Sequence, residues 1–373
     1  MTRTIATVTL SALLTTAFPV ARADAAGLAK PVQHFREVVR SRDGFLTWEK
    51  KLVMEKRPVP ESPVHWDAQI WKDGDTWFQL IGGRKDGKGA AHLRSSPDLD
   101  RWTYRKAICS GLLGPYWELP YLVPLGGKYL LFVGRGNPYW VGSYDKQTMT
   151  FTPDKAEPKN VDRGSYYSFN LHMVDDKGPD RARRQLMHGW VTGPASPTKS
   201  VPYWQGAHSI PRVIELKDDR LVQEPVPEIE VLRGKHYPPP DLSAPNSLKD
   251  VRGDALEIIA TFRPGDAAQF GLKLRVAEDG RAFVTVAFDT KTGNFGINGR
   301  MQPSYVEPGG PVTMRVFLDR SIVEVYVNGA AQTARVFPDK KVQGTAIFSE
   351  GGQAKLTSLD VWEINSMWSK TKE

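Results

Sequence analysis

Hydrophobic and polar residues alternate with a period of two along most of the chain, which is the pattern of half-buried β-strands. Examples are residues 77–81, 128–133, 282–288 and 323–327, which are bounded by Gly, Asp, Asn or Pro. No long stretch has the 3.6-residue period of an amphipathic helix. The 33 Gly and 28 Pro separate the short runs. The pattern therefore predicts an all-β chain of propeller, sandwich or barrel type.

A proline-rich segment divides this pattern in two. Gly234 is followed by three consecutive prolines, residues 238–240, which lack backbone donors and disfavour a sheet. Beyond them, residues 255–362 predict strands spaced about eight to twelve residues apart, as is typical of a β-sandwich. We therefore expect a propeller-like domain over residues 26–233, a linker over 234–250 and a β-sandwich over 251–373.

The first residues have the composition of a secretory signal peptide. Arg3 supplies a positive charge, residues 5–20 are apolar and small, and Ala21-Arg22-Ala23 fits a small-residue cleavage site. The apolar stretch is short for a membrane span, and no later segment approaches spanning length. An alternative cut would follow Ala23-Asp24-Ala25. The sequence therefore predicts a signal peptide over residues 1–25, a secreted or periplasmic protein, and no membrane association after cleavage.

Charge and cysteine content exclude several classes of partner. The formal net charge is +8, but Lys and Arg are scattered singly among acidic residues, so we expect no nucleic-acid partner. Cys109 is the single cysteine, which excludes an intrachain disulfide and a cysteine-based metal site. His65 and His208 have no ligand-like companions nearby in the sequence, so we expect neither a metal nor another cofactor. Association into a homo-oligomer stays open.

Two carboxylates stand out against apolar surroundings. Glu118 lies in Trp117-Glu118-Leu119-Pro120, directly before an apolar run, and such a setting favours the protonated form that a general acid needs. The alternative is a surface glutamate beside a strand. Asp67 lies between Trp66 and Ala68, where an unpaired carboxylate is costly to bury. A role facing a sugar is one interpretation of Asp67, and a turn or a structural salt bridge is the other.

Four segments in order along residues 41–368 resemble motifs of glycoside hydrolase family 32, the invertase, levanase and inulinase group. Residues 117–120 resemble the family's Glu-Cys-Pro motif, and residues 65–71 resemble its Arg-Asp-Pro strand. Residues 204–212 are similar to its Trp-x-Gly-x-x-Ser-Leu-Pro-Arg segment, and residues 318–329 to its appended sandwich. The resemblance implies a partial five-bladed β-propeller followed by a C-terminal β-sandwich.

The same resemblance implies roles for individual residues. Glu118 corresponds to the general acid/base, and Asp67 to the aspartate that binds sugar hydroxyls and stabilises the transition state. The expected substrate-binding residues are Trp117, Trp66, Trp204, Asp162 and Tyr167, with core packing as the alternative for the three tryptophans. Asp319 and Glu324 are expected on a solvated face of the sandwich.

The family's nucleophile has no counterpart in the sequence. Family members begin with a Trp-Met-Asn-Asp-Pro-Asn-Gly segment whose aspartate forms the covalent intermediate, whereas residues 26–40 contain no Asp. We therefore expect the first blades to be missing or shortened. Trp66, Ala68 and Leu119 also replace the Arg, Pro and Cys of the two catalytic motifs.

These observations support three interpretations. The first is an exported β-fructosidase acting on fructans or sucrose-like β-fructosides, with its nucleophile unidentified. The second is a non-catalytic remnant that binds an oligo- or polysaccharide. The third is a truncated gene product that does not fold stably.

Overall fold

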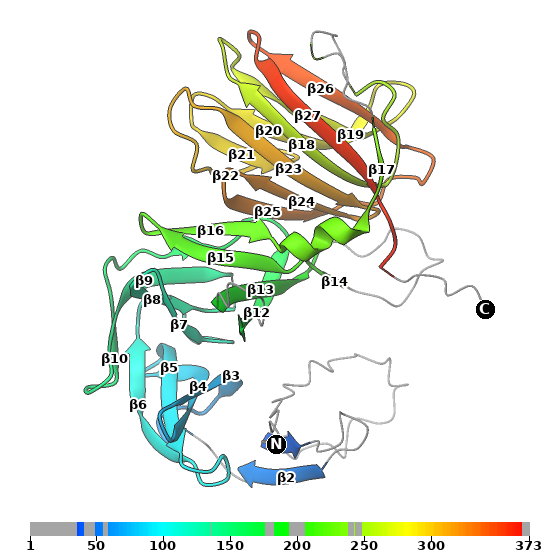
Figure 1. Cartoon of the computed structure of the whole chain (residues 1–373). Helices are drawn as coiled ribbons and strands as arrows, with labels where there is room; N and C mark the ends of the chain where they lie inside the picture. Colours follow the sequence, from blue (N-terminus) through cyan, green and yellow to red (C-terminus); the bar gives the residue numbers. More distant parts are fainter. Residues whose placement is uncertain are drawn as a thin grey trace, which may run out of the picture. The chain divides into compact units, whose positions relative to one another are not determined.

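The protein is described by a computed structural model (Figure 1) that covers residues 36–40, 49–54, 59–134, 136–175, 183–193, 206–237, 242 and 248–367. For residues 36–40, 49–54, 66, 172–175 and 183 it describes the backbone alone. The chain divides into two compact units, Met1–Arg135 with Trp140–Pro158 and Gly136–Tyr139 with Lys159–Glu373. Across the described ranges, η1 (Pro227–Leu232) is the single helical element, and no helix there has the length and apolar character of a membrane span.

The first unit contains two antiparallel sheets whose strands follow one another in chain order. The first sheet comprises β3 (His65–Asp73), β4 (Thr76–Lys85), β5 (Lys88–Ser96) and β6 (Thr103–Ser110). The second comprises β7 (Tyr121–Leu125), β8 (Lys128–Phe132), β9 (Pro138–Asp145) and β10 (Thr150–Pro153). β11 (Lys159–Asn160) pairs with Pro138 and Tyr139 at the start of β9, and these residues belong to the second unit. A separate pair is formed by β1 (Arg36–Arg40) and β2 (Glu49–Met54). Four-stranded meanders of this kind are typical of propeller blades.

A shared apolar core joins these two sheets. It is built from Leu80, Leu93 and Ile108 of the first sheet, and Leu122 and Leu131 of the second. These residues are buried because alternate positions of each strand point to the same face. The two sheets therefore form one packed body.

The second unit begins with another antiparallel sheet. Its strands are β12 (Tyr166–Asp175), β13 (Arg183–Val191), β14 (Ala207–His208), β15 (Arg212–Lys217) and β16 (Arg220–Pro225). The chain then passes through η1 into the sandwich, as Figure 1 shows.

The sandwich consists of a six-stranded and a five-stranded antiparallel sheet. The first has the order β17 (Arg233–His236), β27 (Lys355–Ile364), β18 (Ala255–Arg263), β23 (Val312–Asp319), β24 (Ile322–Val327), β25 (Ala330–Arg335). The second has the order β22 (Arg300–Pro303), β21 (Asn294–Ile297), β20 (Ala282–Asp289), β19 (Gln269–Val276), β26 (Gly344–Glu350). Alternate residues of both sheets, such as Ile258, Leu272 and Val316, fill one core.

The strand pattern predicted from the sequence is confirmed, since residues 77–81, 282–288 and 323–327 fall within β4, β20 and β24. The predicted linker over residues 234–250 is wrong for its first residues, which continue a sheet. Gly234 lies in β17, which pairs with β27 through Arg233↔Ile364 and His236↔Trp362. The three prolines that motivated the linker prediction lie outside the described residues.

Candidate active site

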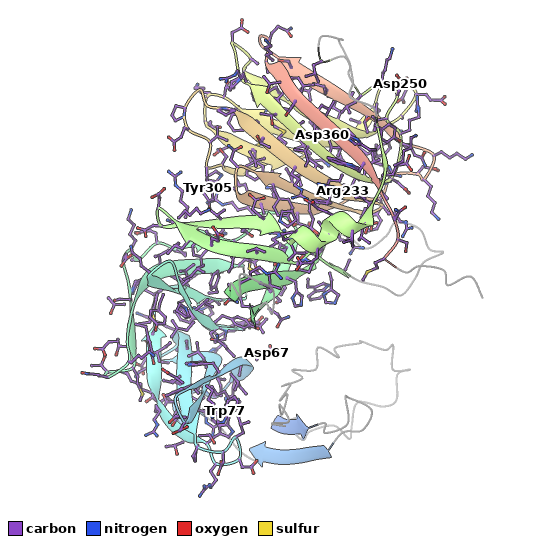
Figure 2. The ribbon with its side chains drawn as sticks, viewed as in Figure 1. Asp67, Trp77, Arg233, Asp250, Tyr305 and Asp360 are labelled. Atoms are coloured by element: carbon purple, nitrogen blue, oxygen red, sulfur yellow. The ribbon has the colours of Figure 1, made fainter. Side chains whose placement is uncertain are left out.

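Asp67 is the extra residue of a β-bulge in β3. Trp66 lies opposite Gly82 of β4 and Ala68 lies opposite Ile81, so Asp67 has no partner residue across the ladder. A bulge bends a strand and turns one side chain away from its regular direction. Asp67 is half-buried, and Figure 2 shows Asp67 and Trp77 toward opposite ends of the β3–β4 pair. The bulge therefore presents a carboxylate at one end of this sheet.

The segment that carries Glu118 is held by backbone hydrogen bonds on both sides. The Trp117 N–H donates to the carbonyl oxygen of Gly83 at 3.0 Å, and the Gly134 N–H donates to the carbonyl oxygen of Glu118 at 2.9 Å. Leu119 has a φ of 46°, in the left-handed region that is unfavourable for a branched side chain. Glu118 is half-buried, and its sequence neighbours Trp117 and Leu119 are both buried.

Reciprocal hydrogen bonds tie β3 to the strand that follows Glu118. The Gln69 side-chain amide donates to the carbonyl oxygen of Leu122 at 3.2 Å, and the Leu122 N–H donates to Gln69 Oε1 at 2.8 Å. Gln69 lies two residues after Asp67, and Leu122 lies four residues after Glu118. The two carboxylate-bearing segments are thus linked by one side chain of β3 that bonds to the backbone of β7.

Both segments meet at the Gly82–Gly83 pair of β4. Gly82 faces Trp66 in the ladder, and Gly83 accepts the hydrogen bond from Trp117. The sequence reasoning missed this glycine pair, although glycine inside a strand pattern is a known sign of close backbone approach. The structure therefore brings Asp67 and Glu118 to the same end of one strand.

The prediction that Trp117 stacks on a sugar ring is wrong. Trp117 is 1% exposed, and its Nε1–H donates to the carbonyl oxygen of Leu113 at 2.7 Å. Its ring centroid lies 5.5 Å from that of Trp140, and its indole edge rests on the backbone of Gly89. Trp117 is a core residue of the first unit.

The prediction that Asp162 binds substrate is also wrong, because Asp162 is 3% exposed. Its Oδ2 lies 3.2 Å from Arg212 Nη2 and accepts a hydrogen bond from Thr333 Oγ1 at 2.9 Å. Its Oδ1 accepts a hydrogen bond from the Gly164 N–H at 2.7 Å. Burial raises the pKa of Asp162, and the neighbouring Arg212 opposes this effect. Asp162 is part of a buried ionic network within the second unit.

The expectation of a solvated face is wrong for Glu324, which is 2% exposed and belongs to the same network. It is confirmed for Asp319, which is exposed at the end of β23.

The remaining predicted residues fall in different parts of the chain. Tyr167 is half-buried on β12, and its ring meets that of Trp190 edge-on with a centroid distance of 6.1 Å. Only the backbone of Trp66 is described, and Trp204 lies outside the described residues. Within the described part of the chain, no group of three His, Cys, Asp or Glu side chains could hold a metal ion.

Two family models match nearly the whole described chain. Residues 20–225 match the glycosyl hydrolases family 32 N-terminal domain, and residues 228–363 match the glycosyl hydrolases family 32 C-terminal domain. The chain is 30% identical to a levanase of Bacillus subtilis, over 90% of this chain and 56% of the levanase. It is 26% identical to a sucrose-6-phosphate hydrolase of Zymomonas mobilis, over 87% of this chain and 70% of that protein. The chain thus spans a little over half of the levanase.

Solved structures are similar in fold. A β-fructofuranosidase of Bombyx mori gives a TM-score of 0.73 at 23% identity, covering 89% of this chain and 72% of that chain. A sucrose-6-phosphate hydrolase from Lactobacillus gasseri gives 0.74 at 20% identity, covering 90% and 73%. These proteins combine a β-propeller with a β-sandwich, which confirms the predicted fold class. The number of blades stays a prediction.

Proposed function

Because the chain belongs to glycoside hydrolase family 32, we propose that it is an exported hydrolase of the β-fructosidase type, acting on fructans or sucrose-like β-fructosides. The names of its relatives, a levanase and a sucrose-6-phosphate hydrolase, support this substrate class. The observation that carries the proposal is geometric. The Asp67 bulge and the Glu118 segment, the two sequence-predicted catalytic positions, meet at one glycine pair of β4.

In the proposed reaction Glu118 protonates the glycosidic oxygen while the bond from the fructosyl anomeric carbon to that oxygen breaks. Asp67 accepts hydrogen bonds from the fructosyl hydroxyls, and its negative charge stabilises the positive charge that develops on the ring. In the second half of the reaction, the Glu118 carboxylate takes a proton from the attacking water. A retaining mechanism also needs a nucleophilic carboxylate about 5 Å from the acid. We propose that a position divergent from the family motif, or a second chain, supplies this group.

Hydrolysis assays on sucrose, levan and inulin test the proposal. We expect release of fructose by the unaltered protein, and a loss of about 100-fold or more in Glu118→Gln and in Asp67→Asn. Glu157→Gln is the control, because Glu157 is an exposed glutamate of the same unit. A folded protein that releases no fructose from any of the three substrates would contradict the proposal.

The unidentified nucleophile favours one alternative function, a carbohydrate-binding protein without turnover. It predicts saturable binding of levan or inulin by a protein that releases no fructose. Isothermal titration calorimetry with each polysaccharide distinguishes it from the hydrolase.

Export is the second half of the proposal, and the pattern of Arg3, the apolar residues 5–20 and the Ala21-Arg22-Ala23 site supports it. Expression of the full chain in a bacterium with a periplasm, followed by sequencing of the mature N-terminus, tests it. We expect a new terminus within the three residues that follow Ala23, and an uncleaved cytoplasmic product would contradict export.

A further inference from the structure

The Trp117–Glu118 peptide rests directly on the backbone of β4. A Cβ atom placed on Gly82 would lie 2.4 Å from the Trp117 carbonyl oxygen and 3.2 Å from the Glu118 Cα. Real Cβ atoms do not approach a carbonyl oxygen this closely, because the distance is well inside van der Waals contact. The peptide reaches its position because residue 82 has no side chain.

A second glycine holds the same segment from its other side. A Cβ on Gly134 would lie 2.8 Å from the Cβ of Leu119, and the Gly134 N–H is hydrogen-bonded to the Glu118 carbonyl oxygen. Neither Gly82 nor Gly134 has a positive φ. The backbone of both positions is therefore open to alanine, and the requirement for glycine is one of space.

Gly82 also lies next to the strand segment that carries Asp67. It lies opposite Trp66 in the ladder, immediately before the bulge, and residues opposite one another in an antiparallel pair have Cα atoms about 4.5–5.5 Å apart. One face of Gly82 thus carries the Glu118 peptide, while its ladder partner leads directly into Asp67. Gly82 is therefore in direct contact with both carboxylate-bearing segments.

We infer that Gly82, supported by Gly134, is a positioning residue that sets the separation between the Asp67 and Glu118 carboxylates. The inference rests on the proposed function for its catalytic meaning, since it assigns the spacing of the general acid and its companion. Adding a methyl group at residue 82 pushes Glu118 away from β4 and from Asp67. Proton donation to the leaving oxygen is then impaired, because it depends on distances near 3 Å.

The chain offers a matched control in Gly142. A Cβ there would lie 2.2 Å from the carbonyl oxygen of Thr152, and Gly142 has no positive φ. The clash is of the same kind as that at Gly82 and belongs to the same unit, but it falls between β9 and β10. Gly142→Ala thus reproduces the steric strain without pressing on Glu118.

The kinetic test compares Gly82→Ala, Gly142→Ala and the unaltered protein on sucrose and on an aryl β-fructoside. A phenolate leaves without a proton, so hydrolysis of the aryl substrate does not need a well-placed acid. We expect Gly82→Ala to lose about tenfold or more in kcat/KM on sucrose, with KM within about threefold, and to lose much less in kcat/KM on the aryl substrate. The ratio kcat/KM reports the bond-breaking step, whereas the later attack of water uses Glu118 as a base for both substrates. Gly142→Ala should keep the kcat/KM of the unaltered protein on both. Equal kcat/KM values in the two variants, or equal losses of kcat/KM on the two substrates, would overturn the inference.

A structural readout separates this inference from the proposed function. If the unaltered protein releases no fructose, the proposed function fails, and crystal structures of the unaltered protein and Gly82→Ala decide the inference alone. We expect the Glu118 Cα to move away from Asp67 by about 1 Å in Gly82→Ala, because the methyl group needs that space. A Glu118 that stays in place would overturn the inference. If Gly82→Ala does not fold, Gly134→Ala takes its place in both experiments. It presses on the segment from its other side, so the Glu118 Cα is then expected to move in the opposite direction.

Discussion

Arg212 Nη2 lies 3.1 Å from Glu324 Oε2, in a buried ion pair that joins β15 to β24 across 112 residues of sequence. The same nitrogen contacts Asp162, and its guanidinium carbon lies 4.3 Å and 5.4 Å from the ring centroids of Tyr166 and Tyr326. One buried cation therefore pairs with two buried carboxylates. Such a network is costly to disturb, because removal of one member leaves buried charge uncompensated.

We predict that Arg212→Met lowers the free energy of unfolding of the second unit by about 3–5 kcal/mol. The methionine fills most of the space, but Asp162 and Glu324 lose their shared cation. Urea unfolding followed by tryptophan fluorescence measures the loss. Arg184→Met is the control, because Arg184 pairs at 2.7 Å with Glu228, whose side chain is 61% exposed, and such pairs contribute at most about 1 kcal/mol. Equal losses in the two variants would contradict a special role for the buried network.

The same network predicts a pH dependence of stability. Burial raises the pKa of Glu324 above its ordinary value of 4.5, although Arg212 opposes the shift. The folded protein thus binds this proton more tightly than the unfolded chain does, so the contribution of Glu324 to stability falls as the pH rises above about 4.5. We expect the difference in unfolding free energy between the unaltered protein and Glu324→Gln to shift in favour of the variant between pH 4.5 and pH 7.

Glu228→Gln is the control of opposite sign for that titration. The hydrogen bond from Arg184 lowers the pKa of Glu228, so its small contribution is present above pH 4.5 and is lost as the pH falls below it. Urea unfolding at several pH values measures both variants. The same pH trend in both would contradict the prediction.

The residues of β24 show which parts of the fold the sequence could predict. The alternation of Val323, Val325 and Val327 places them in the core and Glu324 on the opposite face, and the structure confirms this. What alternation cannot predict is that another strand covers the opposite face. Arg212 arrives there from β15, far away in the sequence, and turns an outward position into a buried one.

The carboxylates of the candidate site were predictable for a different reason. Asp67 and Glu118 were found through short motifs, which need no knowledge of contacts. Two structural features hold these carboxylates in place: the bulge in β3 and the close approach of the Trp117–Glu118 peptide to Gly82. Both depend on strand register. Register is decided by pairing between strands, and the residue pattern of a single strand does not contain it.

A third prediction concerns His92, a buried residue of β5. Its Nε2 lies 2.9 Å from the carbonyl oxygen of Arg84, its Nδ1 lies 3.2 Å from the Tyr104 hydroxyl, and burial lowers its pKa from the ordinary value of 6.5. The unfolded chain therefore takes up a proton more readily than the folded protein does. The stability that depends on neutral His92 is present above pH 6.5 and is lost as the pH falls below it.

We expect His92→Gln to be less stable than the unaltered protein at pH 8, with a gap that narrows as the pH falls below 6.5. Thermal unfolding between pH 8 and pH 5 measures the gap. His92→Phe serves as a second variant, because it also removes the titrating ring and should narrow the gap over the same range. A constant gap for both variants would show that His92 does not titrate differently in the folded protein.

The last prediction tests the revised role of Trp117. If it is a core residue, Trp117→Ala leaves a cavity between the two sheets of the first unit and costs about 3–5 kcal/mol of unfolding free energy. If it stacked on a sugar, the same change would weaken substrate binding and leave stability nearly unaltered. Trp77→Ala is the control, since Trp77 is half-buried on β4 and lies away from Asp67. The Lys72 Nζ lies 5.7 Å from the centroid of the Trp77 ring.

Urea unfolding of both variants, together with KM for sucrose, separates the two roles. We expect a loss of stability in Trp117→Ala that is several times that in Trp77→Ala. Trp117→Phe should recover most of it, because a phenyl ring still packs against Trp140 and Gly89. Where Trp117→Phe is fully folded, its KM should match that of the unaltered protein. A raised KM in a stable Trp117→Phe protein would contradict the core role and support substrate binding by Trp117, because a ring that is buried in the core does not contact the sugar.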